Sequence, residues 1–274
     1  MKKTKILFLN VGRRVELIQS FQNNSLKSQY SYVVYGSDID PLSPALKFVD
    51  KVLTTQPIHS ENYIAKLIAS INAHEIDAII PLIDTNLSIL ASNKDLIEAK
   101  TKAKIIISGL QTIKNFEDKL LTSEFFESHE ILTPKRYSIH DLDYKFPLII
   151  KPRFGSSSHN VFIINTLNEL EFFQRYIDKP IIQQYIKGQE YTLDLLINKN
   201  GEPIYIVPRK RIKIRSGEIL QGQIDKDQEL IRRARKILDF EPFFGPITMQ
   251  AIKKDNHYYF IEINISSIKM VCIF

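Results

Sequence analysis

Short apolar runs alternate with segments of helical periodicity along the first 110 residues. Residues 62–73 show the clearest helical pattern, because Ile64, Leu67 and Ile71 share one face. Strands that alternate with helices are typical of βαβ units and a parallel sheet. We expect strands over residues 5–10, 32–36, 78–82 and 104–108, with helices over residues 15–22, 62–73 and 87–99.

The pattern changes beyond about residue 114, where short strands follow one another with few helices. Asn198 to Gly201 ends in Asn-Gly, a preferred hairpin turn, which favours antiparallel pairing. This part of the chain therefore reads as α+β. We expect helices over residues 116–127 and 228–238, and strands over residues 147–151, 161–165, 181–185, 191–197, 203–207, 248–253 and 257–264.

The composition is that of an ordinary globular protein, with 274 residues, 44% hydrophobic and 25% charged. The longest apolar runs are too short to span a bilayer, and the apolar run near the start resembles a buried strand rather than a signal peptide. The expected compartment is the cytoplasm, with no membrane partner. A single cysteine, Cys272, excludes an internal disulfide framework.

The net charge of +6 admits two interpretations, an anionic ligand or a lysine-rich surface. Most basic residues are scattered along the chain, which favours the surface interpretation. They concentrate at residues 151–153 and 209–215. Nucleic-acid binding rests on net charge alone, so we expect no nucleic-acid partner.

The turn after the first strand contains Gly12, Arg13 and Arg14. A dinucleotide site needs three glycines at fixed spacing, and only one is present. A dinucleotide-dependent oxidoreductase is therefore disfavoured. The two arginines have two open interpretations, an anion site at a helix start or solvated side chains.

The most informative segment places Lys151 at the end of a strand, followed by a loop of small residues. Small residues let backbone N–H groups approach a phosphate, and the lysine supplies a point charge. Alone, such a segment is more often an ordinary hairpin. The loop residues are Gly155, Ser156, Ser157 and Ser158.

Oxygen-bearing side chains mark the last predicted hairpin. Glu262 and Asn264 are two residues apart on one strand and share a face, and Gln250 can face them from the other strand. Oxygen ligands suit Mg²⁺ that keeps water and phosphate in its remaining positions. The alternative is a half-polar hairpin that faces water.

Taken in order, these segments resemble the ATP-grasp superfamily, in particular its carbamoyl-phosphate-synthase-like and amino-acid-ligase branch, through about Asn264. The resemblance implies an α/β fold with a Rossmann-like pre-ATP-grasp domain and a two-lobed α+β ATP-grasp domain whose C-terminal part is incomplete. The implied boundaries are residues 1–110, 111–180 (the lobe with the phosphate loop) and 181–274.

The resemblance also assigns roles to residues. Lys119 and Lys151 would hold phosphates under the loop of Gly155, Ser156, Ser157 and Ser158. The adenine segment would be Gln183, Gln184, Tyr185 and Ile186, with Glu190 on the ribose. Gln250, Glu262 and Asn264 would be the metal ligands. Arg209 and Arg211 fall where related ligases place catalytic basic residues.

The implied activity is an ATP- and Mg²⁺-dependent ligase, with Mn²⁺ as a substitute, that joins a carboxylate to an amine through an acyl phosphate. Its partners would be small-molecule acids and amines. Related ligases often form homodimers.

Two departures from the family pattern bear most on function. Gln184 stands where this branch usually has Glu, although an amide oxygen can still accept from the adenine amino group. After Asn264 the family continues with Pro-Arg and glycines, whereas this chain runs through apolar residues to Phe274. Loss of that arginine would cost about 10² to 10³ in rate. The alternative prediction is therefore an ATP-binding protein, or truncated remnant, without turnover.

Overall fold

The structure is a computed structural model that describes residues 3–27, 31–138, 141, 143–155, 159–215 and 218–265. The predictions for Ser156, Ser157 and Ser158, and for residues 266–274, lie outside the described residues. The described chain forms two units. The first contains residues up to 113 together with 244–246, and the second contains residues 114–243 and 247–265.

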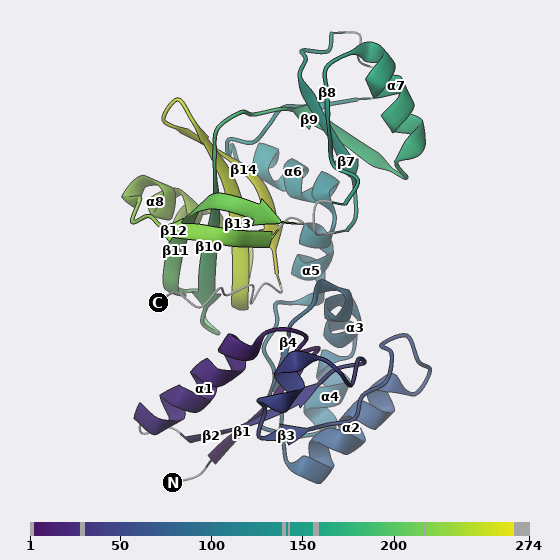
Figure 1. The fold of residues 1–274 in the computed structure, drawn as a ribbon, viewed down its shortest axis with the longest axis vertical. Coiled ribbons are helices and arrows are strands. Elements are labelled where there is room, and N and C mark those ends of the chain that lie inside the picture. Colours follow the sequence, from purple (N-terminus) through teal and green to yellow (C-terminus); the bar gives the residue numbers. More distant parts are fainter. Residues whose placement is uncertain are drawn as a thin grey trace. The chain divides into compact units, whose positions relative to one another are not determined.

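The first unit contains a five-stranded parallel sheet in the order β3-β2-β1-β4-β5 (Figure 1), which confirms the parallel sheet predicted from the alternating pattern. Phe8, Val34 and Ile80 of three strands pack against Leu17 and Ile18 of the first helix. The strands are β1 (Lys3–Leu9), β2 (Ser31–Ser37), β3 (Lys51–Val52), β4 (Ala78–Pro81) and β5 (Lys104–Ile105). The helices are α1 (Val15–Lys27), α2 (Tyr63–His74), α3 (Leu87–Ser92) and α4 (Lys94–Lys100), with short 3₁₀ turns at Pro44–Lys47 and Asp84–Asn86.

The second unit begins within α5 (Leu110–Glu117) and contains two antiparallel sheets, as the sequence of short strands predicts. The smaller sheet, in the order β6-β9-β7-β8, packs Leu148, Ile150 and Ile164 against Leu170 of α7. Its elements are β6 (Arg136–Tyr137), β7 (Leu148–Pro152), β8 (Phe162–Ile164), α7 (Leu167–Tyr176) and β9 (Pro180–Gln184), preceded by α6 (Lys119–Ser128).

The larger sheet has the order β12-β11-β10-β13-β14. Asp227, the residue before α8, anchors that helix to the sheet. Its carboxylate accepts from the Leu230 N–H as a helix cap and from the Lys253 ammonium of β13 at 2.9 Å. The elements are β10 (Gln189–Ile197), β11 (Pro203–Arg215), β12 (Glu218–Ile224), α8 (Gln228–Ile237), a 3₁₀ turn (Leu238–Phe240), β13 (Gly245–Lys254) and β14 (His257–Asn264).

Two predicted helices are each divided by a polar residue. Asn93 separates α3 from α4, and its side-chain amide donates to the Ile89 carbonyl at 2.9 Å. Asp118 separates α5 from α6 and accepts from the Leu120 N–H at 2.9 Å. Asn and Asp compete for backbone groups in this way, so they favour helix ends over helix interiors.

Helix α7 and the strand pair β11–β12 differ from the sequence prediction. A capping pair marks the start of α7, where Thr166 accepts from the Glu169 N–H and Glu169 accepts from the Asn165 N–H. β11 was expected to end at residue 207, but it continues through Pro208 and the basic run because antiparallel partners on both sides hold it.

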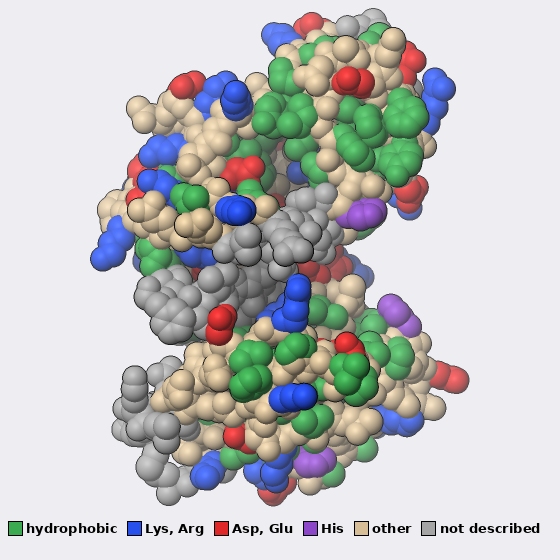
Figure 2. Space-filling view, viewed as in Figure 1, with side chains coloured by type: hydrophobic (Ala, Val, Ile, Leu, Met, Phe, Trp, Pro, Cys, Tyr) green, Lys and Arg blue, Asp and Glu red, His purple; other side chains and the backbone are tan. Residues whose placement is uncertain are grey.

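Helix α7 keeps part of its apolar surface exposed. Leu170 is buried in the core, whereas Phe172 and Tyr176 are 61% and 60% exposed. Figure 2 shows apolar side chains gathered on the part of the molecule that Figure 1 labels α7. The helix therefore covers its sheet with only one side.

The loop between β9 and β10 lies tightly against β13. A Cβ atom at Gly188 would lie 2.3 Å from the Lys253 carbonyl oxygen and 2.8 Å from Ile252 Cγ2. Backbone atoms cannot move aside as a flexible side chain can, so only glycine fits this contact. The close approach holds the loop of residues 185–188, whose first two residues belong to the segment predicted to meet adenine.

We expect Gly188→Ala to lower the free energy of unfolding by about 1–3 kcal/mol, because the added methyl group forces the loop from β13. Urea unfolding measures the change. The matched control is Gly109→Ala, where nothing lies within 4 Å of the added Cβ. Equal stability of the two variants would contradict the close contact.

Candidate functional site

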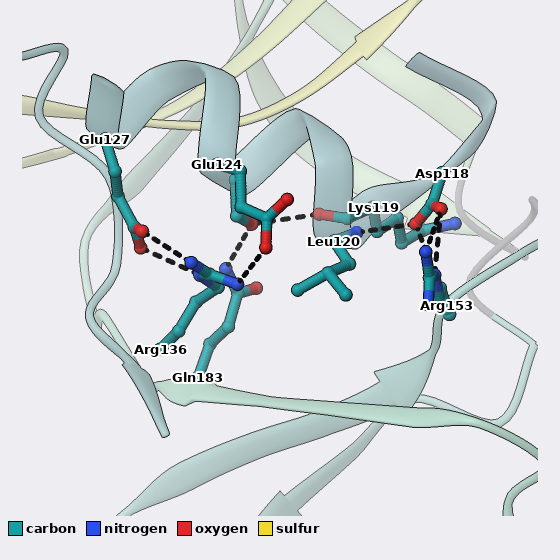
Figure 3. Close-up of polar contacts among 9 residues, drawn as sticks. Asp118, Lys119, Leu120, Glu124, Glu127, Arg136, Arg153 and Gln183 are labelled. Atoms are coloured by element: carbon teal, nitrogen blue, oxygen red, sulfur yellow. Dashed lines mark hydrogen bonds and ion pairs between the residues drawn. The ribbon is translucent and has the colours of Figure 1, made fainter. Parts of the chain in front are cut away.

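Lys119 is the first residue of α6, and the residue before it fixes its position. The buried Asp118 carboxylate caps the helix and accepts from Arg153 Nε at 2.7 Å and Nη2 at 2.6 Å (Figure 3). Burial raises the pKa of Asp118, but the hydrogen bonds from Arg153 and Leu120 outweigh burial and hold that pKa below its usual value. The Lys119 N–H also donates to the Arg153 carbonyl at 3.0 Å.

The Asp118–Arg153 contact joins the start of α6 to the end of β7, the strand that carries Lys151. Sequence reasoning identified both lysines but gave Asp118 and Arg153 no role. The signal was present, since an Asp immediately before a helix is a common cap. Its partner 35 positions along the chain could not be read from the sequence.

The Lys119 ammonium lies 4.0 Å from Glu262 Oε1 of β14 and donates to the Gly155 carbonyl at the start of the predicted phosphate loop. Burial lowers the pKa of Lys151 to about 8, the Glu262 carboxylate partly offsets this, and the Lys119 ammonium adds to the lowering. The structure therefore brings both predicted phosphate lysines and one predicted metal ligand into mutual electrostatic range.

A chain of polar contacts continues across the larger sheet. Gln250 Nε2 donates to Glu262 Oε2 at 2.9 Å, and Arg211 Nη1 donates to Gln250 Oε1 at 2.9 Å. The same Arg211 nitrogen lies 3.4 Å from Glu190 Oε2. The register explains this alignment, because Gln250 is paired with Glu262 across the β13–β14 hairpin.

Asn264 is paired with Thr248 and lies two residues from Glu262 on the same strand, so both side chains belong to one face. Among the described residues, no group of three or more His, Cys, Asp and Glu side chains could hold a metal ion. The donors here are one carboxylate and two amides. Such oxygens fit Mg²⁺ that takes its other ligands from water and phosphate.

The predicted adenine segment divides into buried and accessible parts. The Gln183 side chain is buried and donates to Ser123 Oγ of α6 at 3.0 Å, and Ile186 is also buried. Gln184 is half-buried at the end of β9, where its N–H donates to Lys135. The Tyr185 N–H donates to the Pro147 carbonyl at 3.2 Å.

The two arginines predicted as catalytic have different surroundings. Arg209 is 3% exposed and holds the buried Asp194 through Nε at 2.5 Å and Nη2 at 2.9 Å. This geometry commits the Arg209 guanidinium to Asp194. Arg211 belongs to the polar chain that ends at Glu262.

Comparison with known families gives two successive matches. Residues 6–106 match the PylC-like N-terminal domain, and residues 116–265, more than half of the chain, match the ATP-grasp domain. The chain belongs to the ATP-grasp family. The family assignment agrees with the resemblance seen in the sequence, and the observed sheets confirm the predicted fold class.

Two curated ATP-grasp relatives show how far the similarity extends. Carbamoyl-phosphate synthase of Methanobrevibacter smithii is 24% identical over 144 residues, which is 50% of this chain and 39% of that protein. D-alanine–D-alanine ligase of Petrotoga mobilis is 32% identical over 143 residues, which is 44% of this chain and 47% of that protein. The match thus spans about half or less of the length of these relatives.

Solved ATP-grasp structures share the fold at low identity. N5-carboxyaminoimidazole synthetase from Staphylococcus aureus, complexed with ADP, has a TM-score of 0.74 at 19% identity and covers 95% of this chain and 70% of its own. L-amino acid ligase from Bacillus licheniformis has a TM-score of 0.69 at 15% identity, covering 97% and 67%.

Within the part of the chain that the structure describes, no helix has the length and apolar character needed to cross a bilayer.

The Arg209–Asp194 pair generates a stability prediction. We expect Asp194→Leu to lower the free energy of unfolding by about 3–5 kcal/mol, because it leaves the buried Arg209 charge without its partner. The double variant Asp194→Leu/Arg209→Met should recover most of this loss, since it removes the stranded charge. Chemical denaturation measures both. A double variant no more stable than the single one would contradict the pairing.

Proposed function

We propose that the chain is an ATP- and Mg²⁺-dependent ligase that joins a small carboxylate to an amine through an acyl phosphate. The observation that carries the proposal is the convergence of Lys119 and Lys151 on Glu262, itself bonded to Gln250. The family assignment supports ATP as a substrate. The relatives named as D-alanine–D-alanine ligase and L-amino acid ligase favour an amide-forming reaction.

The reaction balances without a redox partner. A substrate carboxylate oxygen attacks the γ-phosphorus of ATP, the bond to ADP breaks, and an acyl phosphate forms. The amine then attacks the acyl carbon, phosphate leaves with the bonding electron pair, and the amine loses a proton. Both steps need charge neutralisation and positioning more than covalent help from the protein.

Each candidate site residue would supply one part of that requirement. Lys119 and Lys151 would bind phosphate oxygens as point charges. Glu262, Gln250 and Asn264 would hold Mg²⁺, which neutralises phosphate charge when bound. The backbone from Gly155 onward, with the loop serines 156–158, would approach the phosphates.

The nucleoside end has its own candidates. Glu190, whose side chain is 40% exposed, would accept from the ribose hydroxyls. Gln184 and the Tyr185 and Ile186 backbone would meet adenine, and buried Gln183 would hold that segment to α6 through Ser123. Arg211 contacts both Glu190 and Gln250. It would therefore orient Glu190 directly, and Glu262 through Gln250.

We expect ATP with Mg²⁺ to bind the protein. Lys151→Met should raise the dissociation constant about 10- to 100-fold, because it removes a hydrogen bond to a charged group. Isothermal titration calorimetry measures both. The exposed Lys145 provides the matched control, since Lys145→Met removes a charge from the same lobe. Unchanged affinity in Lys151→Met would contradict the phosphate role.

Phosphate release with a panel of amino acids then separates ligase from binder. The proposal expects release that requires both a carboxylate and an amine. Binding of ATP without any release would contradict the ligase and support an ATP-binding protein without turnover.

The pKa of Lys151 predicts a pH dependence. The charged form binds phosphate, and this form is lost as the pH rises through about 8. Affinity for ATP should therefore fall progressively above this pH, toward the affinity of Lys151→Met. The measurement is ATP titration between about pH 7 and 9.5, a range that brackets this pKa.

The same titration of Lys151→Met should lack this decline, and Lys151→Arg should move it beyond the range because arginine stays charged. A decline of equal size in Lys151→Met would assign the pH dependence to another group.

A further inference from the structure

The first unit contains a cavity of about 210 Å³ between α2 and the carboxyl ends of β1 and β2. This volume exceeds that of several water molecules, each of which occupies about 30 Å³ in the liquid. Four leucines form its apolar lining, Leu7 and Leu9 of β1, Leu53 after β3, and Leu67 of α2. In open α/β sheets, ligands bind at the carboxyl ends of strands.

One residue that lines the cavity, Ser37, has a hydroxyl without a hydrogen-bond partner among the described residues. Ser37 is the last residue of β2 and is 3% exposed. A buried hydroxyl without a partner costs about 1–3 kcal/mol, so native proteins rarely keep one without a reason. The oxygen has almost no accessible surface, so a ligand in the cavity would satisfy it once the Ser37 side chain turns to another rotamer.

The remaining polar lining favours an anion. Lys66 of α2 contributes an ammonium group, and Tyr63 contributes a hydroxyl whose pKa burial raises to about 12, so it stays protonated and able to donate. Thr54 and Gln56 add further donors. Among the described residues that line the cavity there is no aspartate or glutamate.

We propose that this cavity binds a small aliphatic carboxylate of amino-acid size, with its hydrocarbon part on the leucines and its carboxylate bound by Lys66 and the Ser37 hydroxyl. This site lies within the first unit and needs no nucleotide, so it goes beyond the ligase proposal. An apolar lining with a few polar donors is the usual composition of small-molecule sites.

The test uses the full chain and two probes of matched shape, isocaproate and isoamylamine, which differ in the charge of the polar end. Calorimetry or ligand-observed NMR should show saturable binding of isocaproate without ATP, and at least tenfold weaker binding of isoamylamine. Equal binding of the two probes, or none, overturns the proposal.

Two variants locate the binding. Ser37→Ala should lower the affinity for isocaproate about tenfold, the value of one hydrogen bond to a charged group. The melting temperature without ligand should stay equal or rise, because the variant removes a buried hydroxyl that has no partner among the described residues. Lys66→Gln should lower the affinity for isocaproate about three- to fivefold, as expected for an exposed charge pair. Lys47→Gln, an exposed lysine outside the cavity, is the matched control.

Unchanged isocaproate affinity in Ser37→Ala overturns the proposed site. ATP affinity should be the same in all three variants, so failure of this proposal and failure of the ligase proposal are distinguishable.

Discussion

Two ammonium groups of like charge, those of Lys119 and Lys151, are held within electrostatic range of one another in a partly buried position, and the contacts of the candidate site hold them there. Like charges repel one another more strongly where burial removes the water between them. The depressed pKa of Lys151, near 8, expresses burial together with this repulsion. Glu262 is the carboxylate that offsets both lysines, so a bound anion would be stabilised by whatever positive charge remains.

The two lysines stay in place because the residues beside them, Asp118 and Arg153, bind each other. Asp118 caps α6 directly before Lys119, and Arg153 follows Lys151 by two residues on β7. Their ion pair, with the Lys119 N–H on the Arg153 carbonyl, prevents the helix and strand from moving apart. Figure 3 shows a second tie along α6, where Arg136 of β6 contacts Glu124 and Glu127. A charged site of this kind needs a rigid frame, because side chains that could separate would relieve the repulsion.

Much of the fold was predictable because its periodicities are strong. The parallel sheet and the last hairpin follow from apolar runs and from alternation, and both were confirmed. Asn93 and Asp118 divided predicted helices because their side chains bond locally, an effect that apolar spacing does not report. β11 was cut short because its basic run resembles an exposed loop, whereas its partners on both sides make it a strand.

The candidate site residues were proposed from the sequence, but their contacts could not be predicted from it. Arg209 and Arg211 are two residues apart and of one type, which gives no sign that one is buried on Asp194 and the other lies beside Glu190. That difference depends on register, since Arg209 is paired with Thr192, two residues from Asp194. The cavity that Ser37 lines depends likewise on how α2 packs on β1, which no local pattern encodes.

Gln250 shows why an amide suits the centre of the polar chain. Its nitrogen donates to Glu262 while its oxygen accepts from Arg211, and a carboxylate could not do both because it has no proton to donate. The contacts fix the orientation of the amide, with the oxygen toward the cation and the nitrogen toward the anion. An amide oxygen has two lone pairs, so it can accept from Arg211 and still offer one to a metal ion. A neutral residue at this position also leaves Glu262 as the negative charge that faces the two lysines. If the site binds phosphate as proposed, the balance between those three charges, rather than any single ligand, would set how strongly it does so.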